Sequence, residues 1–99
     1  MLTKPGKTMA PEEAQKIAME ALTQLARDPE LVGRFLAMAG IGPESIREAA
    51  AEPGFLAGVL EFYMSDEALL LAFCENAGLR PTMIAAARFT LSDDGLYDV

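Results

Sequence analysis

The sequence predicts an all-α protein, a compact bundle of about six short helices. Three observations predict it. Helix-starting residues recur along the chain, apolar residues recur at helical spacing, and no useful length of the sequence shows the period-two alternation of a strand. Hydrophobic residues make up 52% of the 99 residues, which suits one domain with one core. We therefore expect a single helical domain over 10–91, between a flexible segment at 1–9 and an acidic flexible tail at 92–99.

The expected helices follow from their start and stop residues. The start motifs are Asp-Pro-Glu at 28–30, Gly-Pro-Glu at 42–44, Glu-Pro-Gly at 52–54, Ser-Asp-Glu at 65–67 and Arg-Pro-Thr at 80–82. Pro suits a first turn because its missing N–H would have no partner there, and Asp or Ser can cap the free amides. Gly40 and Gly78 follow apolar runs and fit the left-handed position that ends a helix. The predicted helices span 9–27, 29–39, 43–51, 53–64, 66–77 and 81–90.

An internal repeat appears when Asp28 is placed on Asp66, because Gly40 then falls on Gly78 without a gap. This indicates two pseudo-repeated three-helix units packed face to face, and chance combined with shared capping residues is the alternative. Positions that are apolar in both copies should face the core: Leu31 and Leu69, Phe35 and Phe73, Ile46 and Ile84. The remaining expected core residues are Ile17, Ala21, Leu22, Leu25, Phe55, Leu56, Val59, Leu60 and Phe62.

Composition restricts the partners and the location. Eight Lys and Arg against fifteen Asp and Glu give a net charge of −7, which disfavours binding to the phosphates of nucleic acid. No apolar run reaches the roughly 18 residues that span a bilayer, so we expect no membrane partner. The N-terminus lacks the pattern of a signal peptide, and the single cysteine, Cys74, fits a reducing compartment. We therefore expect a cytoplasmic protein.

Catalysis is not expected, and neither is a cofactor or a metal. The chain has no histidine, which removes the Ser–His and Cys–His nucleophile arrangements and every His-containing zinc site. Cys74 lies in an apolar helix, where a buried thiol is unreactive. The acidic pairs at 12–13 and 66–67 sit at helix starts, where carboxylates are stabilised by the helix dipole. A carboxylate-dependent enzyme stays as one alternative.

DNA binding is the other alternative, because ENAGLRPTMIAAAR (75–88) looks like the turn and second helix of a helix-turn-helix. Its glycine, proline and isoleucine are needed for two helices to cross closely, and they carry no information about DNA. A recognition helix must also present hydrogen-bonding side chains to the bases. If this alternative holds, the contacts would come from Arg80, Thr82 and Arg88.

The difference between the two copies gives the favoured hypothesis, a protein-interaction or self-associating module. The outer face of the third helix is polar, whereas the sixth helix carries Met83, Ala85, Ala86 and Phe89 at the corresponding positions. An exposed apolar patch usually marks a contact surface. The expected partner is an unidentified protein or a second copy in a homodimer, and the alternative is a monomer in which helix one covers the patch. The candidate interaction surface comprises Met64, Leu71, Met83, Ala86 and Phe89.

Two runs, DPELVGRFLAMAGIGPESIREAAAEPGFLAGVLEF and DEALLLAFCENAGLRPTMIAAAR, resemble a family of small bacterial proteins catalogued as domain of unknown function 3572. The resemblance covers roughly residues 10 to 90, and FLAMAGIGP and LLLAFCENAGL are its most specific parts. It implies an all-helical cytoplasmic protein from a bacterium. The family has no assigned activity and no functional residues to transfer to this chain.

Overall fold

A computed structural model describes residues 9–52 and 54–96, with side chains described as far as Ser92. These residues form helices and connecting turns without any strand, so the predicted all-α class is confirmed. The elements are α1 (Pro11–Ala26), α2 (Pro29–Ala39), a 3₁₀ turn η1 (Pro43–Ser45), α3 (Ile46–Ala50), α4 (Phe55–Met64), α5 (Glu67–Ala77) and α6 (Pro81–Leu96). None of the helices in the described ranges combines the length and apolar character needed to cross a bilayer.

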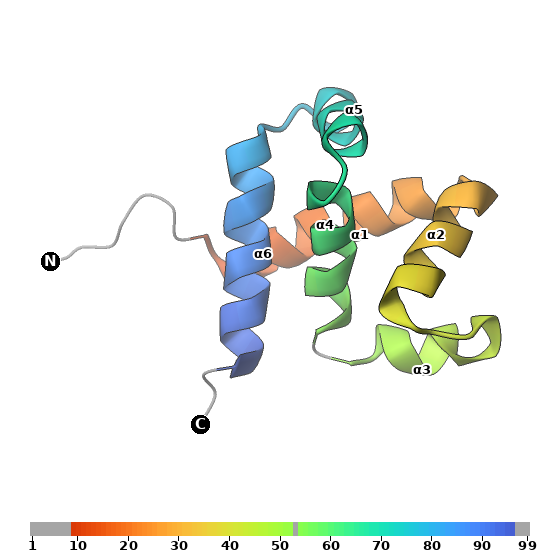
Figure 1. The fold of residues 1–99 in the computed structure, drawn as a ribbon. Helices are drawn as coiled ribbons and strands as arrows, with labels where there is room; N and C mark the ends of the chain where they lie inside the picture. Colours follow the sequence, from red (N-terminus) through yellow and green to blue (C-terminus); the bar gives the residue numbers. More distant parts are fainter. Residues whose placement is uncertain (1–8, 53, 97–99) are drawn as a thin grey trace, which may run out of the picture.

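Three helices build the centre of the bundle. α4 and α6 run side by side in opposite directions, and α1 crosses behind both of them (Figure 1). α2 packs on α1 and α4, α5 lies across the end of the bundle where α6 begins, and α3 lies at the opposite end. The central position of α6 means that the last helix closes the core.

The core is apolar throughout and rich in aromatic side chains. The largest fully buried side chains are Phe73, Leu25, Leu60, Ile84 and Val59. The ring of Phe35 packs edge-on against Phe55 and Phe62, with centroid distances of 5.7 and 5.6 Å. Such edge-to-face pairs contribute about 0.5–1.5 kcal/mol beyond their buried area. The expected core residues are therefore buried or half-buried, with one exception described below.

The local structure around both caps is similar in the two copies of the predicted repeat. The carboxylate of Asp28 accepts a hydrogen bond from the amide of Glu30 at 3.0 Å, and that of Asp66 accepts one from the amide of Leu69 at 3.2 Å. Gly40 and Gly78 both have a positive φ, 72° and 71°. A glycine adopts this conformation without strain because it has no Cβ.

The third helices break the repeat, and here the prediction for Ile46 was wrong. α3 has five residues and packs mainly on α4, whereas α6 has sixteen and packs on α1, α4 and α5. Ile46 is consequently 37% exposed, while Ile84 is fully buried. The short α3 follows from the sequence after it, since Pro53 and Gly54 prevent its continuation.

Several helix boundaries also differ from prediction. α1 begins at Pro11 rather than residue 9, and α4 begins at Phe55 rather than residue 53. α6 continues to Leu96, past the predicted end at 90 and into the predicted tail. Leu91 is buried and extends the inward face, so packing favours a longer helix although two aspartates follow, which are unfavourable near a helix C-terminus. Residues 1–8 of the predicted N-terminal segment and 97–99 of the tail lie outside the described residues.

Candidate functional site

One face of α6 is covered by other helices of the same chain. Ile84, Ala87 and Leu91 recur at helical spacing, are buried, and face α1 and α4. The hydroxyl of Thr90 donates a hydrogen bond to the carbonyl oxygen of Met9 at 3.3 Å, which fastens α6 to the residues that lead into α1. The inward face of the last helix therefore belongs to the core.

Two of the residues expected on the interaction surface are only partly accessible. Met83 and Ala86 are half-buried, because they border the inward face of α6. Met83 and Ala86 therefore contribute only part of their side-chain surface to the candidate interaction surface. The exposed surface of α6 is therefore formed mainly by the residues next to them around the helix.

A stripe of α6 stays exposed among the described residues, and Phe89 dominates it. Thr82, Ala85 and Phe89 recur at the spacing of one helix face, and all three are exposed. We call these three residues the α6 outer stripe. Phe89 is 58% exposed, the largest exposed fraction among the exposed large hydrophobic side chains. An exposed aromatic ring in the middle of a central helix is the best-defined part of the predicted surface.

Met64 and Leu71 are exposed as predicted but lie elsewhere on the bundle. Met64 ends α4 and Leu71 lies on α5, at the end of the molecule where α6 begins (Figure 1). Phe89 lies near the middle of α6 instead. The five predicted residues therefore do not form a single open patch.

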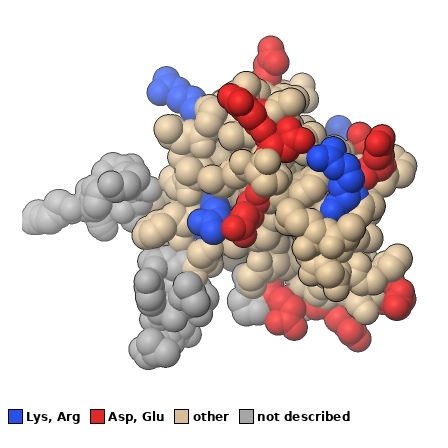
Figure 2. Space-filling model, viewed as in Figure 1, with Lys and Arg blue, Asp and Glu red and all other residues tan. Residues whose placement is uncertain are grey.

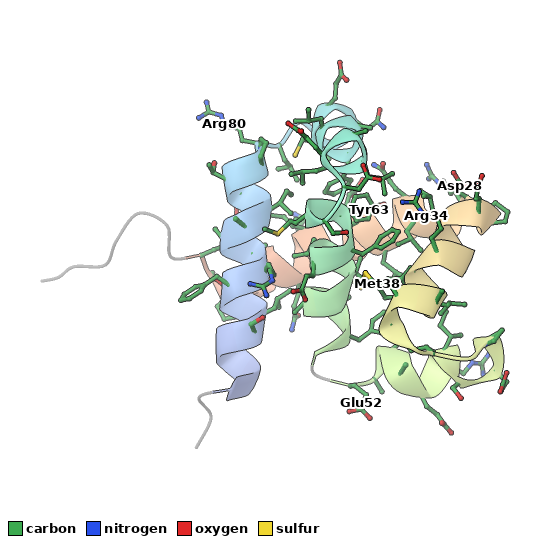
Figure 3. All side chains as sticks on the ribbon, in the orientation of Figure 1. Asp28, Arg34, Met38, Glu52, Tyr63 and Arg80 are labelled. Carbon is green, nitrogen blue, oxygen red and sulfur yellow. The ribbon has the colours of Figure 1, made fainter. Side chains whose placement is uncertain are left out.

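The residues proposed for DNA contact do not form a basic surface. Arg88 pairs with Glu61 of α4, with 3.1 Å between Nη2 and Oε2. Arg80 and Thr82 are exposed at the start of α6, and the Arg80 side chain points away from the body of the protein (Figure 3). On the face in Figure 2, Lys and Arg side chains stand singly among Asp and Glu. The face shown in Figure 2 thus offers phosphates no concentrated positive charge.

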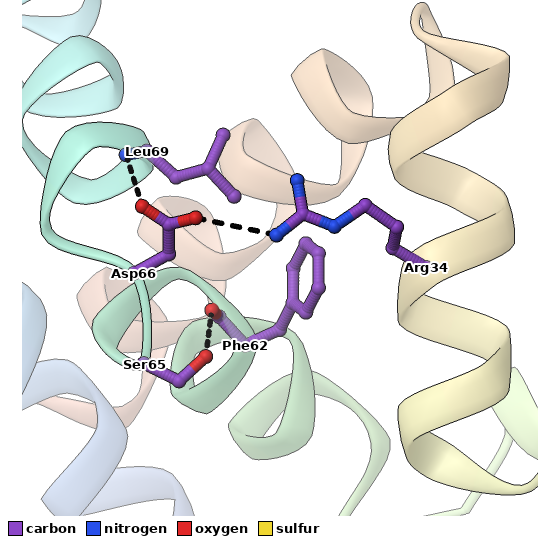
Figure 4. A network of polar contacts seen from close by, with 5 residues as sticks. All are labelled: Arg34, Phe62, Ser65, Asp66 and Leu69. Carbon is purple, nitrogen blue, oxygen red and sulfur yellow. Dashed lines mark hydrogen bonds and ion pairs between the residues drawn. The ribbon is translucent and has the colours of Figure 1, made fainter.

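An ion pair that the sequence did not indicate joins α2 to the start of α5, and so joins the two copies of the predicted repeat (Figure 4). Nη2 of Arg34, on α2, lies 3.2 Å from Oδ2 of Asp66, the residue that caps α5. The guanidinium also lies over the ring of Phe62, with its Cζ 5.9 Å from the centroid, a favourable cation–π position. The hydrogen bond from the Leu69 amide, together with the one from Arg34, lowers the pKa of Asp66 below its ordinary value.

A groove of about 620 Å³ lies between α1 and the C-terminal end of α5. It was not predicted, because its two walls are far apart in the sequence. Its lining residues are Glu12, Glu13, Lys16, Ile17, Glu20, Asn76, Ala77 and Leu79.

Two side chains of reactive types, Cys74 and Tyr63, are buried in the core. Cys74 is buried as predicted, and burial raises the pKa of its thiol. The hydroxyl of Tyr63 donates a hydrogen bond to the carbonyl oxygen of Ala21 at 3.0 Å, and burial, followed by the charge of Asp28, raises its pKa. Within the described ranges, no three His, Cys, Asp or Glu side chains are grouped so that they could hold a metal ion.

Comparison with known proteins identifies a family for this chain but no activity. Neither the curated proteins nor the solved structures contain a match to this chain. The model of the family described as "Protein of unknown function (DUF3572)" matches residues 11–94, from the start of α1 almost to the end of α6. The chain therefore belongs to the DUF3572 family.

Proposed function

We propose that the protein is a non-catalytic protein-interaction module and that its contact surface is centred on Phe89. The observation that carries the proposal is the 58% exposure of this ring on a helix whose other face is core. Aromatic side chains are enriched at protein interfaces, where a single buried ring can contribute a large part of the affinity. The α6 outer stripe supplies a flat approach to the ring, because Ala85 is small.

Charge favours a protein partner over a nucleic acid. The net charge is −7, and Arg88, one of three residues considered for DNA contact, is already paired with Glu61. The first partner to test is a second copy of the chain, since a self-complementary contact needs no other protein. Cys74 needs no disulfide partner in a reducing compartment, so we place this interaction in the cytoplasm.

The proposal is tested by a matched pair of variants. Met38→Glu is the control for Phe89→Glu, because Met38 is similarly exposed, at 52%, but lies on α2. Sedimentation over a wide concentration range should show that wild type and Met38→Glu associate to the same extent, while Phe89→Glu remains a single chain. Circular dichroism should show equal helix content in all three.

A partner other than a second copy is tested with the same variants. If the wild type is a single chain, proteins bound to it in extracts of its native cell should be retained by Met38→Glu and lost from Phe89→Glu. Equal masses and equal sets of bound proteins for all three chains would refute the proposal. Salt-sensitive binding of duplex DNA that weakens on Arg80→Ala would support the DNA alternative instead.

A further inference from the structure

The groove between α1 and α5 combines an apolar floor with an acidic rim. Ile17 is buried beneath it, and Ala77 and Leu79 are half-buried in its wall. The exposed carboxylates of Glu12, Glu13 and Glu20 follow its α1 side, spread along about two turns of the helix. Lys16 is the one cation in this lining, so the lining is negative overall.

The other wall adds negative potential of a different kind. α5 ends at Ala77, and its last carbonyl groups lie at the negative end of the helix dipole. Asn76 is exposed there, and its amide can both donate to and accept from a peptide backbone. Acidic side chains and a helix C-terminus therefore favour the same kind of ligand, a positively charged one.

The spacing of the carboxylates indicates whether the groove suits a metal ion or a longer organic cation. They do not converge, since no described group of three acidic side chains could hold a metal ion. Separated charges along an apolar floor suit a long cation, in which aliphatic carbons lie on the floor and charged ends reach the rim. Lys and Arg side chains have this construction. The volume of about 620 Å³ is within the range of ordinary ligand sites.

We propose that this groove binds an extended basic peptide segment of a partner protein, in which Lys or Arg side chains alternate with aliphatic ones. Glu12 and Glu20 bind the charged side chains, and an aliphatic side chain packs on Ile17, Ala77 and Leu79. None of these residues belongs to the α6 outer stripe, so the groove is a second site and does not depend on the function proposed for Phe89. Its acidic rim repels anionic lipid surfaces and nucleic acids.

The full chain is titrated with a soluble acetylated peptide of alternating lysine and leucine, and binding is followed by calorimetry and by amide chemical shifts. Shifts should concentrate at residues 12–20 and 76–79. A peptide of alternating lysine and serine should bind more weakly because it lacks the apolar contact, and a peptide of alternating glutamate and leucine should not bind.

Variants distinguish the groove from general charge attraction. The double change Glu12→Gln and Glu20→Gln should weaken the lysine–leucine peptide about three- to tenfold, as expected for two exposed ion pairs. The matched control, Glu30→Gln with Glu52→Gln, removes the same charge from exposed positions outside the groove and should leave the affinity unchanged. Lys16→Glu should strengthen binding.

Equal weakening in the two double variants, or shifts spread over the whole surface, would overturn the proposal. So would equal affinity for the lysine–leucine and lysine–serine peptides. Phe89→Glu serves as a further control, because it should abolish the contact proposed for α6 and leave peptide binding intact. Failure at one site is thereby distinguished from failure at the other.

Discussion

The two halves of the chain begin alike and end differently. Residues 28–41 and 66–79 share an aspartate cap, a helix of the same length and a left-handed glycine. They also share the closing hydrogen bond, from the Ile41 amide to the Leu36 carbonyl oxygen and from the Leu79 amide to the Cys74 carbonyl oxygen, at 3.0 and 2.9 Å. After this point the first half forms the five-residue α3, and the second forms the sixteen-residue α6.

The comparison separates what short-range sequence determines from what packing determines. A cap and a glycine fix the geometry of a turn in both halves, because their hydrogen bonds are made within a few residues. The length and burial of the following helix depend on which surfaces are available to it. α6 packs against both α1 and α4, whereas the place of α3 at the end of the bundle leaves much of it in water.

The largest expected difference is between the paired isoleucines. Ile84→Ala removes a fully buried side chain and should lower the free energy of unfolding by about 2–5 kcal/mol. Ile46→Ala removes a side chain that is 37% exposed and should cost less than half as much. Urea denaturation measures both. Equal losses would mean that α3 and α6 contribute equally to the core.

The paired glycines should instead behave alike. Gly40→Ala and Gly78→Ala place a Cβ on a backbone with positive φ, and nothing lies within 4 Å of either added atom. Each change should therefore cost about 1 kcal/mol from backbone strain alone, after the gain from a stiffer unfolded chain. Thermal unfolding of both variants checks this. A much larger loss at only one glycine would show that the two turns are not equivalent.

Mutation of Tyr63 should have a smaller effect on stability, and this effect has no counterpart in the first copy of the repeat. It occupies the place of Leu25 in the repeat, and its hydroxyl donates to Ala21 of α1. Tyr63→Phe should lower the free energy of unfolding by about 0.5–1.5 kcal/mol, the usual net value of a hydrogen bond. Because burial raises the tyrosine pKa, this residue stabilises the fold fully below its unfolded pKa and loses that contribution as pH rises through the folded pKa. The Phe variant should lose less stability in that alkaline range.

The smallest expected effect is a change in the pH dependence of stability at acid pH, and it concerns Asp66, the cap of α5. The pKa of Asp66 is lowered in the folded protein, so its charge stabilises the fold above the unfolded pKa, and this contribution is lost as pH falls through the folded value. Asp66→Asn should flatten the dependence of stability on pH below about pH 4. Asp28→Asn is the control, because Asp28 caps α2 without the arginine contact that Asp66 has. Equal flattening would argue against a special role for Arg34.

The sequence was sufficient wherever a structural feature depends on neighbouring residues. Asp28, Gly40 and Gly78 have the predicted roles because capping and the left-handed turn are local. Ile46 was misplaced because its pattern matches that of Ile84, and only the packing of whole helices distinguishes them. The extension of α6 was missed for the same reason, since Leu91 is buried by helices distant in sequence.

The candidate sites were less accessible to sequence reasoning. Phe89 was identified because the two copies differ at its position, which is a comparison within the chain. The groove was missed because its two walls are far apart in the sequence, and because Glu12 and Glu13, considered alone, have the pattern of an ordinary helix start. The ion pair of Arg34 and Asp66 was missed because the two residues are 32 positions apart, and the sequence does not show which carboxylate lies beside an exposed arginine.

The contact of α6 with α1 also sets an order of events during synthesis. α1 is made first and α6 last among the described helices, yet the two share one of the main interfaces of the core. The apolar side of α1, including Ile17 and Ala21, lacks this cover until residue 91 has left the ribosome. The domain therefore completes its core only after nearly the whole chain shown here has emerged.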